Sequence, residues 1–145
     1  MLETHLRGGD RVLDVGTGTG ILAIASVKLG ASMAVGIDND EWAIDNARDN
    51  VIANGVSNLV AIGTQPLSEF RPSQFDLITA NLTLNTIIGM LGEFHRLLAP
   101  GRMVLLSGLL GHDQPPLLSH LAEQRFAVAE TISEHEWIAI AARTL

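Results

Sequence analysis

The sequence predicts an α/β fold built on one mostly parallel sheet. Short apolar runs of the kind found in strands alternate with helical segments along the chain, as they do where helices connect parallel strands. The 145 residues are 47% hydrophobic and only 17% charged, a composition typical of a globular chain, and their number suits one domain. We therefore expect seven strands, five of them alternating with helices and the last two forming a hairpin.

The first half of the chain holds three expected strands and two expected helices. RVLDVG is the first strand, GILAIASVKLG is the helix that Gly30 ends, and MAVGID is the second strand. The clearest helix is DEWAIDNARDNVIANG, in which Asp40 is a suitable N-cap and Gly55 a stop signal. We expect Trp42 to pack against the sheet edge together with the apolar face of this helix. LVAIG, at 59–63, is the third strand. In the helix DEWAIDNARDNVIANG, the apolar residues that repeat at helical spacing are Ala43, Ala47 and Val51.

The second half continues the alternation and then closes with the hairpin. FDLITANL, at 75–82, is the fourth strand, and the helix that follows from about Leu84 to Leu98 is expected to end at a Pro100–Gly101 turn. RMVLLSG is the fifth strand, and Asp113 with Pro115–Pro116 opens another helix. FAVAETIS and EWIAIAART are expected to pair antiparallel at the end of the chain.

Charge and composition narrow the possible partners. The formal net charge is −7 and only nine residues are Lys or Arg, which makes nucleic acid an unlikely direct partner. The absence of cysteine excludes disulfides and thiolate metal sites, and no apolar run is long enough to cross a membrane. No histidine pair has metal-ligand spacing, so we expect no metal. These features favour a cytoplasmic protein that acts on a small molecule or another protein.

The first strand leads into a loop with glycine at every second position, Gly16, Gly18 and Gly20. Such a loop, at the carboxyl end of a parallel strand and the N-terminus of a helix, is suited to a closely approaching anionic ligand. Asp38 ends the second strand and is placed to accept hydrogen bonds from both hydroxyls of a ribose. The alternative interpretation is a simple tight turn with Asp38 as a helix cap.

A nicotinamide dinucleotide is a poor match for this loop. The fingerprint of such sites is G-x-G-x-x-G, and here Ile21 stands at the third glycine position. A carboxylate at Asp38 would also repel the 2′-phosphate of NADP. An NAD-dependent oxidoreductase is therefore disfavoured.

The segments VLDVGTGTG, VGIDND and FDLITANL, in this order, resemble the class I methyltransferases that bind S-adenosylmethionine. The match narrows with LLAPGRMVLLSGLL, ITANL and EWIAIAART, which resemble the catalytic domain of PrmA-type methyltransferases of ribosomal protein L11. The resemblance covers the chain from about Arg11 to Arg143. It implies a seven-stranded Rossmann-like sheet and an enzyme that methylates protein amino groups with S-adenosyl-L-methionine as cofactor.

Three features depart from that family. Its N-terminal domain, which grips the ribosomal protein, has no counterpart among these 145 residues. A threonine-containing segment that helps hold the cofactor would fall before Met1, and an NILAN-like stretch appears here as NLTLN. We therefore expect residues 1–145 to form a single S-adenosylmethionine-binding domain, which is either an excised catalytic domain or a stand-alone relative with another substrate.

The resemblance implies specific roles for the cofactor-binding residues. The methionine part of the cofactor would lie over the glycine loop, held by backbone groups of Gly16, Thr17, Gly18 and Gly20. Asp14 would reach the cofactor's ammonium group or order the loop, and an alternative is that it only ties the loop down.

Three further residues would contact the nucleoside part of the cofactor. Asp38 would take the ribose hydroxyls, and Asn39 would lie at the edge of the adenine. Thr64 stands after the third strand, where many class I methyltransferases have an acidic residue for the adenine amino group.

The acceptor would meet the methyl group at the end of the fourth strand. The side-chain oxygen of Asn81 and the carbonyls of Asn81 and Leu82 can accept hydrogen bonds from an amine and aim its lone pair, and Asn81 is also expected to contact the cofactor. Relatives that methylate nucleic-acid bases carry Asn/Asp-Pro-Pro-Tyr at this place, and the chain has no such aromatic residue, which favours an aliphatic amine. The alternative is that Asn81 merely caps the next helix.

The sequence thus favours an N-methyltransferase of protein amino groups, with a Lys-rich ribosomal protein as a compatible acceptor. Two alternatives stay open. One is a catalytically silent module that binds S-adenosylmethionine, and the other is a methyltransferase for a small molecule or RNA.

Overall fold

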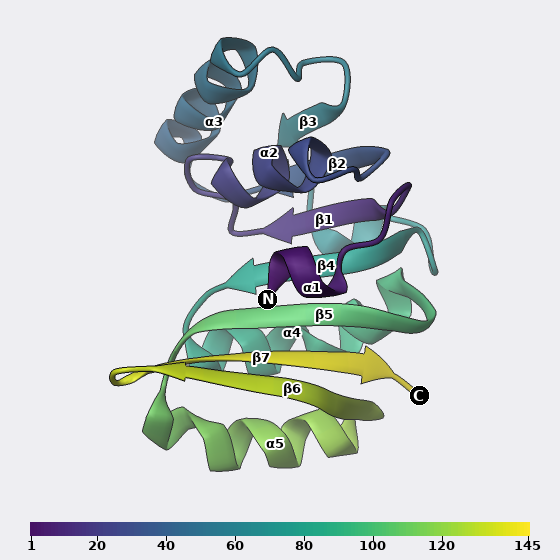
Figure 1. Ribbon diagram of the computed structural model, residues 1–145, viewed down its shortest axis with the longest axis vertical. Helices are drawn as coiled ribbons and strands as arrows, with labels where there is room; N and C mark the ends of the chain where they lie inside the picture. The colour runs from purple at the N-terminus through teal and green to yellow at the C-terminus, as the bar shows by residue number, and fades with distance from the viewer.

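The computed structural model describes all 145 residues, which form one seven-stranded sheet covered by helices on both faces (Figure 1). The strand order is β3-β2-β1-β4-β5-β7-β6, so the predicted seven-stranded α/β fold is confirmed. The strands are β1 (Arg11–Val15), β2 (Met33–Ile37), β3 (Val60–Gly63), β4 (Phe75–Asn81), β5 (Leu98–Leu110), β6 (Phe126–Glu134) and β7 (Trp137–Thr144). The α-helices are α1 (Leu2–His5), α2 (Ile21–Lys28), α3 (Glu41–Ala53), α4 (Leu84–Leu97) and α5 (Gln114–Glu123). Two short 3-10 helices are η1 (Leu67–Glu69) and η2 (Gly111–Asp113).

The pairing pattern places the carboxyl ends of five strands at one edge. β1 pairs parallel with both β2 and β4, β2 with β3, and β4 with β5. The last two strands join antiparallel, β7 between β5 and β6, as the sequence predicts for a terminal hairpin. The order reverses between β1 and β4, and this is the switch point at which open α/β sheets bind ligands.

Two apolar clusters hold the layers together. The larger one joins the sheet to α4 and α5, and the smaller one joins the other face to α1, α2 and α3. β4 lies in the middle of the sheet and is covered on both faces, so its residues from Phe75 to Ala80 are all buried. Such continuous burial accompanies a mostly apolar run, in which the two polar side chains, Asp76 and Thr79, are hydrogen-bonded to Arg11 and Asp14.

Helix α3 begins and ends where the sequence predicts. The carboxylate of Asp40 accepts a hydrogen bond from the Trp42 backbone N–H at 3.0 Å, and Gly55 follows the helix with φ of 67°. The expectation that Trp42 packs against the sheet edge is wrong, since this residue is 80% exposed. Its position explains why: it lies two residues from the buried Ile44, on the opposite side of the helix.

The expected Pro100–Gly101 turn is also wrong. α4 ends at Leu97, and the chain enters β5 at once, with Leu98 paired to Phe75. Pro100 and Gly101 lie inside this strand, where the pairing with β4 shifts register, and Gly101 takes φ of 73°. A strand irregularity tolerates a proline without N–H and a glycine with positive φ, so the same two residues form a bulge.

An ion network closes the opposite, amino-terminal edge of the sheet. Arg11 donates from Nε to Asp76 Oδ2 at 2.8 Å, and Arg102 Nη2 lies 3.3 Å from Asp76 Oδ1. The Asp76 side chain is only 11% exposed. The Arg11 guanidinium beside it therefore holds the pKa of this carboxyl below its usual value.

Replacing Asp76 with asparagine will lower the free energy of unfolding by about 1–3 kcal/mol near neutral pH, because charge-assisted hydrogen bonds from Arg11 are lost. A carboxyl whose pKa is lowered in the folded state contributes stability above its unfolded value of 3.8 and loses it as the pH falls through the folded pKa. The difference between variant and wild type should therefore shrink below that pH in urea unfolding experiments. Asp49→Asn, at an exposed position of α3, is the matched control, and an equal effect there would contradict the prediction.

No helix is both long and apolar enough to span a membrane.

Candidate functional site

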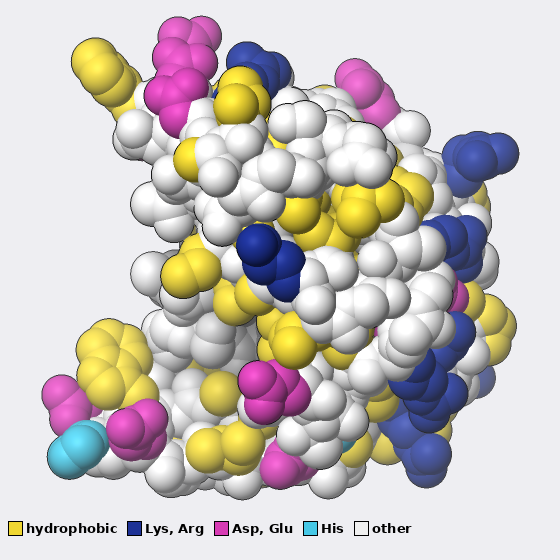
Figure 2. All heavy atoms as spheres, turned by 45° about the horizontal axis from the view of Figure 1, so that its top comes forward, with side chains coloured by type: hydrophobic (Ala, Val, Ile, Leu, Met, Phe, Trp, Pro, Cys, Tyr) yellow, Lys and Arg dark blue, Asp and Glu magenta, His cyan; other side chains and the backbone are white.

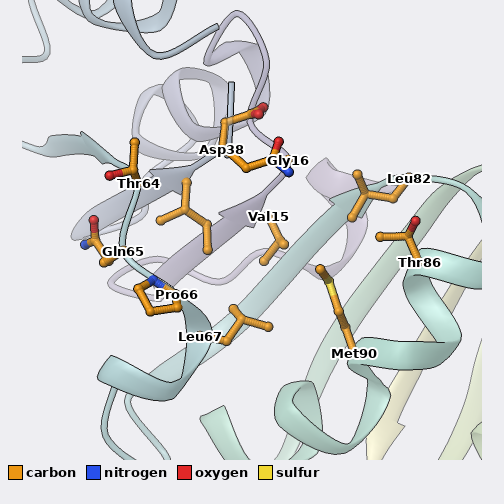
Figure 3. Close-up of a pocket in the computed structure, with 12 residues that line it drawn as sticks. Val15, Gly16, Asp38, Thr64, Gln65, Pro66, Leu67, Leu82, Thr86 and Met90 are labelled. Carbon is orange, nitrogen blue, oxygen red and sulfur yellow. The ribbon is translucent and has the colours of Figure 1, made fainter. Parts of the chain in front are cut away.

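A cavity of about 500 Å³ opens at the switch point between β1 and β4. Figure 3 shows Thr64, Gln65, Pro66 and Leu67 on one side, Leu82, Thr86 and Met90 on the other, and Val15 and Gly16 between them. The volume lies within the usual range for cofactor pockets. Its lining residues are Val15, Gly16, Ile37, Asp38, Asn39, Thr64, Gln65, Pro66, Leu67, Leu82, Thr86 and Met90.

Five of the predicted site residues line this cavity: Gly16, Asp38, Asn39, Thr64 and Leu82. The remaining ones, Asp14, Thr17, Gly18, Gly20 and Asn81, do not line it. They belong to the glycine loop and to the carboxyl-terminal parts of β1 and β4, next to residues that do line it, and Asp14, Thr17 and Gly20 are buried.

The glycine loop depends on backbone conformations that favour glycine. Gly16, Gly18 and Gly20 have φ of 70°, 55° and 82°. A Cβ atom on Gly16 would lie 2.5 Å from Leu82 Cδ2, so glycine lets the loop lie against the end of β4. The backbone N–H groups of Gly16 and Thr17 both donate to the Ile37 carbonyl at 2.9 Å, which ties the loop to β2.

Asp38 joins this loop to the second strand. Its Oδ2 accepts a hydrogen bond from the Gly18 N–H at 2.9 Å, and its Oδ1 accepts one from the Asp40 N–H at 3.0 Å. Each carboxylate oxygen has a further lone pair, and the side chain is partly exposed on the cavity. The carboxylate is thus held in place by two backbone N–H groups and keeps free acceptor capacity at the cavity.

Asp14 lies beneath the loop and is 2% exposed. Its two oxygens accept hydrogen bonds from the hydroxyls of Thr17 and Thr79, both at 2.6 Å. Burial raises the pKa of this carboxyl, and the hydrogen bonds counteract part of that effect. The structure therefore gives Asp14 and Thr17 partners within the protein, the arrangement in which the carboxylate orders the loop.

The sequence did not point to several residues on the two sides of the cavity. Gln65, Pro66 and Leu67 follow β3, and Thr86 and Met90 lie one turn apart on α4. The spacing of Thr86 and Met90, four residues apart in a helix that starts beside Asn81, was an available signal. In the segment after β3 the sequence pointed only to Thr64, because no local pattern marks Gln65, Pro66 and Leu67 as residues that face a cavity.

Asn81 ends β4, and its side chain is exposed. The alternative that it caps α4 does not agree with the structure, because the N-cap of that helix is Thr83. The Leu82 N–H donates to the Ser107 carbonyl at 3.1 Å, which ties this strand end to β5. Asn81 is therefore available at the rim of the cavity.

Fold and cavity together define the class of protein. A seven-stranded sheet with a terminal antiparallel hairpin, a glycine loop after β1 and an acidic residue after β2 is the architecture of class I methyltransferases. The family model described as Ribosomal protein L11 methyltransferase (PrmA) matches residues 1–144. The chain belongs to this family, and the resemblance seen in the sequence is confirmed.

Individual relatives agree with this assignment. A ribosomal protein L11 methyltransferase from Exiguobacterium is 34% identical over 142 residues, which cover 98% of this chain and 46% of that protein. One from Geobacter metallireducens is 40% identical over 136 residues, 94% of this chain and 44% of that protein. The chain thus spans less than half the length of these curated relatives.

Solved structures show the same fold. The crystal structure of ribosomal protein L11 methylase from Lactobacillus delbrueckii subsp. bulgaricus superposes with a TM-score of 0.92 at 29% identity, over 99% of this chain and 75% of that one. An RNA methyltransferase from Salinibacter ruber in complex with S-adenosyl-L-homocysteine reaches 0.73 at 22% identity, over 97% and 81% of the two chains, and so shows the fold alone.

Proposed function

We propose that this chain is the catalytic part of an S-adenosylmethionine-dependent N-methyltransferase whose acceptor is a protein amino group, with ribosomal protein L11 as the substrate. The observation that carries the proposal is the cavity at the β1–β4 switch point, with Asp38 and the glycine loop on its wall. Ribosomal protein L11 is proposed as the acceptor because the relatives are named as methyltransferases of that protein. Such a substrate would place the activity in the cytoplasm, with residues 1–145 acting as one cofactor-binding domain.

The residues around the cavity suit the parts of S-adenosylmethionine. Asp38 would accept hydrogen bonds from the ribose hydroxyls, with Asn39 and Thr64 nearer the adenine. The backbone of Gly16, Gly18 and Gly20 would approach the methionine part, with Asp14 and Thr17 holding the loop beneath. Apolar walls from Leu67, Leu82 and Met90 fit a ligand whose middle carries few hydrogen-bonding groups.

The protein's contribution to the reaction would be the placement of the amine. The cofactor supplies a methyl group that the sulfonium already activates, so no strong base is needed. An aliphatic amine must arrive neutral, although a lysine with a pKa near ~10.4 is mostly protonated at neutral pH. Apolar neighbours such as Leu82 disfavour the charged form, and the oxygens of Asn81 and Leu82 would orient the lone pair.

The distribution of charge supports a cationic acceptor. Figure 2 shows Lys and Arg gathered along the right side, while acidic, histidine and hydrophobic side chains meet at the lower left, where the β6–β7 turn projects. The segments that directly follow β1, β2 and β4 at the carboxyl edge, 16–20, 38–40 and 82–83, contain no Lys or Arg. The exposed acids near this edge favour a basic protein over a nucleic acid. These exposed acids include Asp40, Glu41, Glu134 and Glu136.

The proposal is tested by two measurements on the purified chain. Calorimetric titration should show S-adenosylhomocysteine binding with a micromolar dissociation constant, and radiolabelled S-adenosylmethionine should transfer its methyl group to purified bacterial ribosomal protein L11. Binding without transfer to L11, or to any basic ribosomal protein, would favour the catalytically silent module. The absence of binding at millimolar ligand would contradict the cofactor assignment for this chain.

A further inference from the structure

A glycine far from the cofactor loop lies against the proposed acceptor-binding oxygens. Gly108 belongs to β5, at a point where the pairing with β7 shifts register between Leu106 and Leu109. It takes φ of 79°, so the strand bulges there. The bulge is placed beside the end of β4, because Ser107 pairs with Asn81 and accepts the Leu82 N–H.

The missing side chain of Gly108 lets the end of β4 pack closely against β5. A Cβ atom at this position would lie 2.5 Å from Asn81 Oδ1, 3.0 Å from the Leu82 carbonyl oxygen and 3.1 Å from the Leu82 nitrogen. Since the two oxygens lie 2.5 and 3.0 Å from one point, they are at most about 5.5 Å apart, a separation that allows one amine nitrogen to donate hydrogen bonds to both. Any larger residue would displace Asn81 Oδ1 and the Leu82 backbone from these positions.

Leu82 connects this bulge to the cofactor loop. Its side chain packs at the Gly16 position, and its backbone packs at the Gly108 position. Two glycines with positive φ therefore hold one residue from two sides, the first on the cofactor side and the second on the acceptor side. A displacement of Leu82 at the bulge would move the carbonyl that the acceptor needs.

We propose that Gly108 is a positioning residue of the acceptor site, which keeps Asn81 Oδ1 and the Leu82 carbonyl close together in the arrangement that an amine would need. The inference rests on the proposed function, because it assigns Gly108 a role through Asn81 and Leu82. Gly108 does not line the cofactor cavity, so its effect should fall on methyl transfer and not on cofactor binding.

The test compares Gly108→Ala with Gly55→Ala. Both positions have positive φ, at 79° and 67°, so both variants carry backbone strain, but a Cβ on Gly55 would meet nothing within 4 Å. Gly108→Ala should lower kcat for L11 methylation about 100-fold, with S-adenosylhomocysteine affinity within about twofold of wild type. Gly55→Ala should lose stability only.

Two further variants separate the steric effect of a side chain at position 108 from the backbone strain of a non-glycine residue with positive φ. Gly108→Asn adds a side chain with a residue that tolerates positive φ better than alanine does, so it should fold and still lose kcat. In the double variant Gly108→Ala with Asn81→Ala, the closest contact is gone and only the contacts with Leu82 remain, so the combined loss of kcat should be smaller than the product of the two single losses. Additive losses in this cycle would overturn the proposed role.

The same assay distinguishes a failure of the role assigned to Gly108 from a failure of the proposed function. Methyl transfer by both wild type and the Gly108 variants, within about threefold of each other, would overturn the role of Gly108 and leave the proposed function standing. No transfer to L11 by the wild-type chain would remove the acceptor site, and the role of Gly108 with it.

Discussion

Replacing Asp38 with alanine will weaken the binding of S-adenosylhomocysteine by at least about 100-fold. The carboxylate accepts the Gly18 N–H at 2.9 Å and the Asp40 N–H at 3.0 Å, so it is held in place with acceptor capacity left for two ribose hydroxyls. Hydrogen bonds to a charged group contribute about 1.5–3 kcal/mol each, and two of them amount to a factor of at least ~100 in the dissociation constant. The measurement is calorimetric titration.

The control for Asp38 is Asp45→Ala, which removes the same charge from an exposed position of α3. The dissociation constant of this variant for S-adenosylhomocysteine should lie within about twofold of the wild-type value. An exposed charge acts only weakly on a site more than a Debye length away, because salt screens it. Asp38→Asn should fall between the two, since an amide keeps one acceptor oxygen. Unchanged affinity in Asp38→Ala would mean that the ribose is bound elsewhere or that the cavity holds another ligand.

Replacing Asn81 with alanine will lower kcat for methylation of L11 by about 100-fold and leave S-adenosylhomocysteine affinity nearly unchanged. Asn81 does not line the cofactor cavity, and its Oδ1 converges with the Leu82 carbonyl beside Gly108. Loss of this oxygen leaves an incoming amine with one acceptor, so its lone pair is no longer held in line with the methyl group. Steady-state kinetics with varied L11 concentration separates this effect from weaker acceptor binding.

Thr83→Ala is the control for Asn81. Thr83 lies two residues on, is exposed, and its hydroxyl lies 2.9 Å from that of Thr86. Its loss should leave kcat within about threefold of wild type. If Asn81→Ala and Thr83→Ala lower kcat equally, the loop at the N-terminus of α4 acts as a structural unit, and Asn81 has no particular role in orienting the amine.

Local patterns in the sequence predicted most elements of the fold. Asp40 and Gly55 mark the ends of α3 because capping and left-handed stop residues act over a few residues of chain. The same locality explains the errors. Pro100–Gly101 is typical of a turn, but pairing of Leu98 with Phe75 extends β5 through it, and Trp42 has apolar neighbours in sequence but not in space.

The sequence by itself determined the α/β class, the glycine loop, Asp38 as a ribose-binding candidate and the family to which the chain belongs. Those features are contiguous motifs at strand ends, and parallel pairing brings strand ends together in any fold of this class. Only the tertiary structure decided that Asp14 is bonded to Thr17 and Thr79, and that Gly108 lies against Asn81 and Leu82. Such contacts depend on the register between β4 and β5 and on a bulge in one of them, and a shift by one residue would turn each side chain to the other face of the sheet.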